Sequence, residues 1–213
     1  MKILVTGFDP FGGEKTNPAY EAIKLLPNKI GNSEIIKIQI PTVFSKNPVV
    51  VEEAILKHKP DVVLSIGQAG GRYDISVELV AINLVEARIP DNEGEQPFDK
   101  KLKEDGENAY FASIPVKGIV KNIRDHGIPA SVSYTAGTFV CNSIMYEVLY
   151  MTHNKYKNIK AGFIHVPFSP DQVIEKSKTT PSMSLETMAK AIEYALLAII
   201  EDKEYKEPMG TIM

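Results

Sequence analysis

The sequence lacks the residues that several classes of protein require. Of its 213 residues only one, Cys141, is a cysteine, so the chain cannot form an internal disulfide and we expect a reducing compartment. No apolar run reaches the ~18 residues of a membrane-spanning helix. The first segment is interrupted by Asp9 and Pro10 too early for a signal peptide. We therefore expect a soluble cytoplasmic protein with no membrane partner.

An excess of one charge is also missing. The formal net charge is only −3, which gives no indication of nucleic acid as a partner. The one cysteine and the four scattered histidines show no metal-ligand spacing. The segment GFDPFGG at 7–13 lacks the Lys and Ser/Thr of a phosphate-binding loop and does not match the dinucleotide-binding pattern. We expect neither a metal nor a cofactor.

Short β-rich segments alternate with helical patterns along the chain. This alternation is typical of an α/β protein with an open, mostly parallel twisted sheet and helices on both faces. Because no break marks a second domain, residues 1–201 are predicted to form one domain and 202–213 a flexible tail. The polar segment 90–109 is predicted to be a surface loop, with Asp91 and Glu93 solvated. Strands are expected at 2–7, 33–42, 61–67, 74–89 (one strand or two), 129–137 and 160–168, and helices at 17–26, 46–58, 115–127, 141–153 and 184–202.

Two residues are candidates for nucleophilic chemistry at the carboxyl ends of the strands, where ligands bind in such sheets. Cys141 follows a strand and a turn and opens a helix, whose free N–H groups favour a thiolate with a lowered pKa. His165 interrupts an apolar strand and suits the role of the base beside a thiol. From the residues alone, an inert buried cysteine and a core histidine remain open alternatives.

A third group should orient the imidazole. Glu78 is flanked by apolar residues in a predicted strand, and a buried carboxylate is rare unless it is paired. Glu86 competes for this role, because it has the same parity along the predicted strand as Glu78 and therefore lies on the same face. The alternative interpretation of Glu78 is a solvated charge on an edge strand. The remaining histidines end predicted helices and are expected to face solvent: His58, His126 and His153.

Five blocks of the sequence together resemble one family of cysteine peptidases. The blocks are TGFDPFGGEKTNP, GQAGGRYDISVELVAIN, ARIPDNEG, SYTAGTFVCN and GFIHVPFSPDQ, and the match runs from Met1 to about Ala198. The chain resembles pyroglutamyl peptidase type I, also called pyrrolidone carboxyl peptidase. The resemblance implies an open α/β sheet and an enzyme that removes N-terminal pyroglutamate from peptides through a thioester. It also implies a catalytic triad of Cys141, His165 and Glu78.

Further roles follow from the same resemblance. The arginine of ARIPDN, Arg88, is implied to lie near the oxyanion, and Phe8 and Phe11 of GFDPFGG are implied to sandwich the pyroglutamyl ring. Members of the family are usually cytoplasmic dimers or homotetramers, so a homo-oligomer is expected. Three more residues are implied to line the pocket: Gln68, Phe139 and Val140.

One position departs from the family pattern. Members commonly carry Lys or Arg directly after the catalytic glutamate, whereas this chain has Leu79. Neighbours on a strand point to opposite faces, so Leu79 should not disturb Glu78 directly. Two other functions remain as alternatives: a small-molecule or nucleotide-binding module with an inert cysteine, and a thiol hydrolase that acts on another acyl group.

Overall fold

The structure, a computed structural model, describes residues 1–210. The main sheet contains β1 (Lys2–Phe8), β2 (Lys29–Ile30), β3 (Ser33–Ile40), β4 (Val62–Gln68), β5 (Ile75–Glu78), β8 (Ala130–Ser133) and β9 (Lys160–Val166). A small second sheet pairs β6 (Val80–Ile82) with β7 (Ala109–Phe111). The helices are α1 (Pro18–Lys24), α2 (Asn47–His58), α3 (Val116–Asp125), α4 (Val140–Asn154), α5 (Pro170–Val173) and α6 (Leu185–Ile200).

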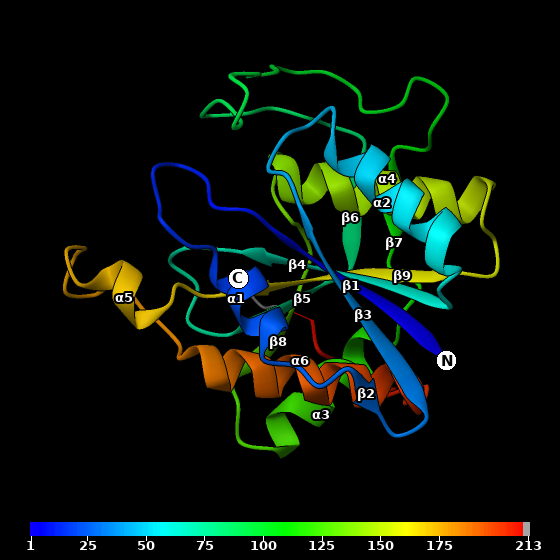
Figure 1. The fold of residues 1–213 in the computed structure, drawn as a ribbon, viewed down its shortest axis with the longest axis vertical. Coiled ribbons are helices and arrows are strands. Elements are labelled where there is room, and N and C mark those ends of the chain that lie inside the picture. Colours follow the sequence, from blue (N-terminus) through cyan, green and yellow to red (C-terminus); the bar gives the residue numbers. More distant parts are fainter. Residues whose placement is uncertain (211–213) are drawn as a thin grey trace.

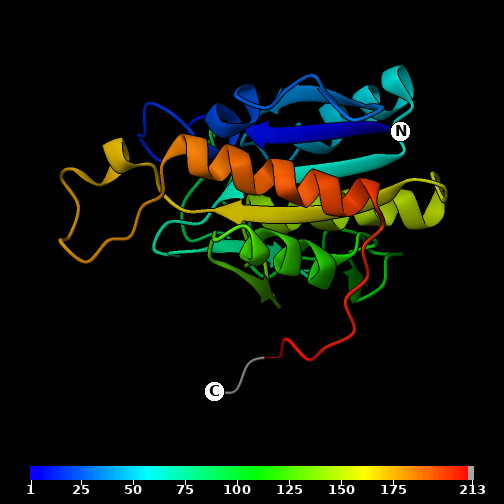
Figure 2. The same cartoon turned by 90° about the horizontal axis from the view of Figure 1, so that it is seen from below.

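The elements form three layers with the sheet in the middle. The strand order is β2-β3-β1-β4-β9-β5-β8. Helices α2 and α4 cover one face, and α1, α3 and α6 cover the other (Figures 1 and 2). Both faces are therefore buried, as the nearly continuous apolar runs of β1 and β4 require. The predicted α/β class, with a mostly parallel sheet and helices on both faces, is confirmed.

Two strands at one end of the sheet, β5 and β8, run against the four central strands, and the short β2 at the other end is antiparallel to β3. β3, β1, β4 and β9 are parallel, whereas β5 is antiparallel to β9, and β8 is parallel to β5. The carboxyl end of β8 therefore points away from the edge at which β1, β4 and β9 end. Residues 134–139 must return to that edge before α4 can begin there. The sequence did not predict this reversal.

Strand parity decides which residues face α2 and α4. In β9, Phe163 packs into the core on that side, and Ile164 packs on the opposite side. Because neighbouring side chains alternate, His165 faces the same side as Phe163. In β5, Val77 packs on the α1–α3–α6 side, so Glu78 faces α2 and α4 with His165.

A long loop between β6 and β7 is anchored by a buried carboxylate. Asp91 is only 6% exposed and accepts N–H bonds from Phe44, Glu93 and Glu95. Burial opposes its ionisation, but these donors outweigh burial and lower the pKa of Asp91. The prediction that Asp91 is solvated is wrong. The residue is buried, and its carboxylate oxygens accept hydrogen bonds from backbone N–H groups that would otherwise bind water.

Two further segments flank the carboxyl edge of the sheet. The turn 9–17 and the excursion 167–183, which carries α5 and projects at the left of Figure 1, are joined by an ion pair. Lys176 Nζ lies 2.9 Å from Glu14 Oε1. Asn17 caps α1 through the Ala19 N–H and also donates to the backbone oxygen of Asp9. These bonds fix the chain on either side of the strand ends.

The last described residues run along α3. A Cβ on Gly118 would stand 1.6 Å from the Lys203 oxygen, so only glycine admits the chain here. Leu79 lines a pocket of about 200 Å³ with Glu204 and Tyr205, on the face opposite Glu78. The predicted domain boundary at 201 stays a prediction, and 211–213 of the predicted tail lie outside the described residues.

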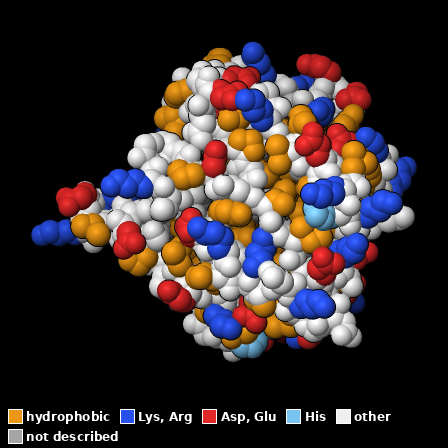
Figure 3. Space-filling view, viewed as in Figure 1, with side chains coloured by type: hydrophobic (Ala, Val, Ile, Leu, Met, Phe, Trp, Pro, Cys, Tyr) orange, Lys and Arg blue, Asp and Glu red, His pale blue; other side chains and the backbone are white. Residues whose placement is uncertain are grey.

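The surface seen in Figure 3 carries acidic and basic side chains interspersed, with no broad area of one sign. This distribution agrees with the small net charge of −3. Within residues 1–210, none of the helices combines the length and the apolar character needed to cross a membrane.

Candidate active site

Glu78 and His165 form a buried hydrogen-bonded pair. His165 Nδ1 lies 2.8 Å from Glu78 Oε1, and the two residues are 4% and 0% exposed. A carboxylate only accepts hydrogen bonds, so Nδ1 carries the hydrogen and Nε2 keeps a free lone pair. The Phe163 ring packs against the imidazole, with 4.8 Å between ring centroids. The imidazole is thus held in one orientation and one tautomer.

The Cys141 thiol lies on the same face of the sheet, over Gly67. A Cβ on Gly67 would stand 2.9 Å from Cys141 Sγ and 2.7 Å from the Phe163 ring, so this strand position admits only glycine. Gly67 pairs directly with His165 across β4 and β9. Sulfur and imidazole therefore lie above neighbouring strand positions.

The start of α4 is fixed by one buried amide. Asn142, 1% exposed, accepts from the Ile82 N–H at 3.0 Å and donates to the oxygens of Ile82 and Leu84. Phe139 is the N-cap and makes no side-chain cap bond. The N–H groups of the first helical turn therefore lack intrahelical acceptors beside Cys141, and a developing negative charge can use them.

The pKa values of thiol and imidazole shift in opposite directions. Burial, followed by the charge of Glu78, raises the pKa of Cys141 from 9.0 to about 12, and Arg72 acts in the other direction. Burial also lowers the pKa of His165 below its usual 6.5, against the hydrogen bond and charge of Glu78. A neutral thiol beside a neutral imidazole results. The predicted lowering of the thiol pKa is wrong here, because desolvation and the charge of Glu78 raise the pKa more than Arg72 lowers it.

Aromatic side chains gather next to the thiol. The Phe139 ring lies 6.3 Å from Phe11 and meets Phe44 edge-on at 5.3 Å, measured between centroids. Phe11 and Phe139 are half-buried, whereas Phe44 and Phe8 are 9% and 2% exposed. Such flat apolar surfaces suit a compact neutral ring as ligand.

Comparison with known proteins identifies the family. The sequence model of the pyroglutamyl peptidase family matches residues 1–202. The chain belongs to the pyroglutamyl peptidase family. The pyrrolidone-carboxylate peptidase of Clostridium botulinum is 58% identical over 213 residues, which is all of both chains. That of Lactobacillus johnsonii is 59% identical over 201 residues, covering 94% of this chain and 93% of the relative.

Solved structures of pyroglutamyl peptidases share the whole fold. Pyroglutamyl peptidase I of Bacillus amyloliquefaciens superposes with a TM-score of 0.92 at 47% identity, covering 96% of this chain and 99% of the other. The pyrrolidone carboxyl peptidase of Thermococcus litoralis gives 0.93 at 41% identity, covering 97% and 99%. The predicted resemblance is therefore confirmed.

The remaining candidates of this pyroglutamyl peptidase lie at different depths. Gln68 is half-buried, and its Oε1 accepts from Gln172 Nε2 at 3.0 Å. Val140 is 1% exposed and packs into the core at the first residue of α4. Arg88 is exposed on the long loop, and its place near an oxyanion stays a prediction. Glu86, the other candidate for orienting the imidazole, is exposed. It bonds to Thr138 through its backbone N–H and its backbone oxygen.

Sequence reasoning missed a basic residue in the site. Arg72 Nη1 lies 2.8 Å from the same Glu78 oxygen that accepts from His165, and 3.3 Å from Ser133 Oγ. Its Nη2 lies 3.3 Å from the Thr135 oxygen. The signal was present in the block GQAGGRYD, where an arginine follows two glycines immediately beyond a strand end.

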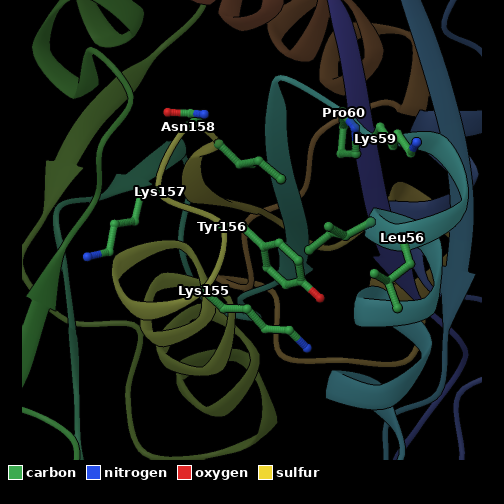
Figure 4. A pocket seen from close by; sticks show the side chains of 9 residues that line it. Leu56, Lys59, Pro60, Lys155, Tyr156, Lys157 and Asn158 are labelled. Carbon is green, nitrogen blue, oxygen red and sulfur yellow. The ribbon is translucent and has the colours of Figure 1, made fainter.

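A pocket lies at the opposite edge of the sheet from the triad. It encloses about 400 Å³ between the end of α2 and the segment after α4, just before β4 and β9 begin. In Figure 4 the ring of Tyr156 points into it, whereas Lys59 and Lys157 point away. With no nucleophile paired to a base, it is not the catalytic site. It is lined by Ile55, Leu56, Lys59, Pro60, Lys155, Tyr156, Lys157, Asn158 and Ile159.

Proposed function

We propose that this chain hydrolyses the amide bond after an N-terminal pyroglutamyl residue, with Cys141 as nucleophile, His165 as general base and acid, and Glu78 as the group that orients the imidazole. One observation carries the assignment: the sulfur lies over Gly67, the direct strand partner of a histidine bonded to a buried carboxylate. Placement of a thiol and a neutral base over neighbouring positions on one face of the sheet supports activated-thiol catalysis.

The first half of the reaction forms an acyl-enzyme. As Cys141 Sγ attacks the pyroglutamyl carbonyl carbon, its proton passes to His165 Nε2. The Nδ1–H bond to Glu78 stabilises the imidazolium that results. The carbonyl oxygen becomes an oxyanion, and the N–H groups at the start of α4 donate to it. His165 then returns the proton to the leaving amine, the C–N bond breaks, and a thioester remains on Cys141.

The second half releases pyroglutamate. Neutral His165 takes a proton from water, whose oxygen attacks the thioester carbonyl. The C–S bond breaks, and the proton returns to the Cys141 sulfur. Neither half-reaction requires a cofactor. The neutral resting pair makes proton transfer part of each attack, because both pKa shifts oppose a preformed thiolate–imidazolium pair.

Recognition of the acyl group is assigned to the aromatic cluster. A pyroglutamyl ring is flat, uncharged and has no α-amine for a carboxylate to bind. Phe11 and Phe139 offer it apolar faces, and Gln68 offers an amide at the end of β4. A site that hydrogen-bonds the lactam group rejects a ring that lacks it, so prolyl amides should be poor substrates.

The protein is further proposed to act as a cytoplasmic dimer or tetramer. A free catalytic thiol is preserved in a reducing compartment. Phe98 and Phe111 are 74% and 67% exposed, and a subunit contact would remove such surface from water. Sedimentation analysis tests the assembly: a purely monomeric species across the working concentration range would refute it.

Two substitutions in the triad, with one matched control, are tested on a pyroglutamyl reporter amide. Cys141→Ser should abolish turnover and leave the thermal midpoint nearly unchanged. Glu78→Gln should lower kcat less, since an orienting group contributes less than the nucleophile. Glu147→Gln is the matched control, because Glu147 is also a buried glutamate, 8% exposed, but is not part of the triad. Its Oε2 lies 3.0 Å from Lys103 Nζ. Wild-type kcat in Cys141→Ser would exclude the assignment.

A substrate panel tests the acyl group. Pyroglutamyl, prolyl and glutamyl reporter amides should give turnover for the first only. Preference for a different acyl group would make the protein a thiol hydrolase of another specificity. Absence of turnover for every amide, with Cys141 inert to alkylation, would favour the binding module.

A further inference from the structure

One oxygen of the triad carboxylate accepts two hydrogen bonds and the other accepts none. Glu78 Oε1 accepts from His165 Nδ1 and from Arg72 Nη1, each at 2.8 Å. Within residues 1–210, Glu78 Oε2 is buried without a hydrogen-bond partner. A free carboxylate turns readily about its last torsion, which is broad and roughly two-fold. A fixed carboxylate plane is therefore needed to keep one oxygen, here Oε1, in line with the imidazole Nδ1.

Arg72 is built to hold that oxygen. Its guanidinium bonds Glu78 through Nη1 and the Thr135 oxygen through Nη2, while Ser133 Oγ lies 3.3 Å from Nη1. Rotating the carboxylate plane out of this orientation would break the bonds of Oε1 to both Arg72 and His165. The planar fork of arginine makes such a clamp directional, which the point charge of lysine does not.

The two glycines before Arg72 explain how it reaches this position. Gly71 has φ +91°, a backbone conformation that side-chain-bearing residues rarely adopt. A Cβ on Gly70 would stand 2.1 Å from the Phe168 ring. The chain turns tightly after β4, with Arg72 N–H donating to the Ala69 oxygen at 3.3 Å. The turn directs the arginine back across the sheet toward Glu78.

We propose that Arg72 is a positioning residue for the hydrolysis: it fixes the plane of the Glu78 carboxylate so that one oxygen stays bonded to His165 Nδ1, and it balances the buried carboxylate charge. The inference rests on the proposed roles of Glu78 and His165. Arg72 does not touch the reacting atoms in this account. It acts through the carboxylate, and through its positive charge, which also lowers the pKa of His165 and of Cys141.

The test compares Arg72→Ala, Arg72→Lys and wild type on a pyroglutamyl reporter amide over a range of pH. Arg72→Ala should lower kcat about tenfold or more with KM changed less than about twofold, since the loss is orientation rather than binding. The ascending limb of kcat/KM should move to higher pH, because the charge that opposes protonation of His165 is gone. Arg72→Lys should keep the limb near its wild-type position while kcat stays low.

Chemical rescue adds a second readout. The Arg72 side chain is 32% exposed, so added methylguanidinium can reach the space left in Arg72→Ala and should restore part of kcat. Arg124→Ala is the matched control: Arg124 Nε donates to the Ala130 oxygen at 2.6 Å, on α3, and its loss should leave kcat and the pH profile unchanged.

Two results overturn the proposal. If Arg72→Ala keeps the wild-type kcat and pH profile while Glu78→Gln is slow, Arg72 has no positioning role and the triad stands. If Glu78→Gln also keeps wild-type kcat, the proposed role of Glu78 fails and the clamp fails with it.

Discussion

At the scale of single residues, desolvation and the neighbouring Glu78 charge favour the protonated thiol of Cys141. Cys141 and His165 are both shifted toward their neutral forms. The single-oxygen bridge of Glu78 keeps Nε2 of the imidazole free to accept a proton. The nucleophile is therefore generated during the attack and is not stored as a thiolate.

The pH dependence of kcat/KM follows from these two directions. The reactive form needs His165 unprotonated and Cys141 protonated. Because the pKa of His165 is lowered, the ascending limb should lie below pH 6.5. Because the pKa of Cys141 is raised, no thiol-dependent descent should occur below pH 9.0. If kcat/KM instead rose with thiol ionisation in the alkaline range, the neutral thiol and neutral imidazole of the resting enzyme would be contradicted.

Gly67 gives a second test at this scale. Gly67→Ala places a methyl group 2.9 Å from Cys141 Sγ and 2.7 Å from Phe163, so the thiol must move. A displacement of about 1 Å at a reacting atom can cost about 100-fold in rate. We expect a loss of kcat of about that size per folded molecule, with a destabilisation of about 1–3 kcal/mol from overpacking.

Gly162→Ala is the control that separates a loss of stability through crowding in the core from a loss of rate through displacement of the thiol. Its Cβ would stand 2.1 Å from Ile114, on the face of the sheet away from the thiol. It should destabilise the protein similarly and leave kcat per folded molecule unchanged. Denaturant unfolding and active-site titration measure the two quantities. Equal losses of kcat in both variants would show that Gly67 is merely a packing position.

At the scale of elements, the placement of α4 is the critical feature. The helix needs its first turn at the carboxyl edge, although the preceding strand β8 ends elsewhere. The three bonds of Asn142 to Ile82 and Leu84 pin that turn to the β6 segment. The position of Cys141 therefore depends on a residue that does not face the substrate.

Asn142→Ala should reduce both stability and turnover. Removal of the amide leaves buried backbone groups of β6 unpaired, at about 2–3 kcal/mol, and releases the first turn of α4. We expect kcat to fall about tenfold or more in the folded fraction. Asn122→Ala is the control, since Asn122 is also buried and donates to the Tyr194 oxygen at 2.8 Å, between α3 and α6. An unchanged kcat in Asn142→Ala would remove the link between this anchor and the thiol.

The elements predicted from sequence were those with strong periodicity or long apolar runs. β1, β4 and β9 are buried on both faces, and α6 keeps one apolar face over 16 residues. The four residues of α5 and the two of β2 carry too little pattern to be seen. Strand direction is set by pairing between distant segments, so the reversal of β5 and β8 was not accessible.

At the scale of the whole molecule, chemistry is concentrated at one edge of the sheet. Segments from β1, β4, β5, β9 and the start of α4 converge there, and the pocket near Tyr156 at the other edge holds no nucleophile paired to a base. The sequence predicted Cys141, His165 and Glu78 as separate candidates and through the family resemblance. It missed Arg72, because the contact with Glu78 depends on how the loop after β4 folds back.

Whole-molecule contacts also show where Leu79 packs. Its side chain faces away from Glu78 and packs on the core beneath α3, beside the segment after α6. The residues that line the pocket with Leu79 include the apolar Ile114 and Val116 and, from the segment after α6, Glu204 and Tyr205. The local sequence could predict which face Leu79 occupies, but not the C-terminal segment that covers it.

The central claim is that Cys141 carries the acyl group. The most direct measurement is an acid-quenched reaction with a pyroglutamyl reporter substrate, followed by intact mass and peptide mapping. The account predicts a mass gain of one pyroglutamyl group on the peptide containing Cys141, and no gain in Cys141→Ala. An acyl group on any other residue, or full turnover by Cys141→Ala, would contradict it.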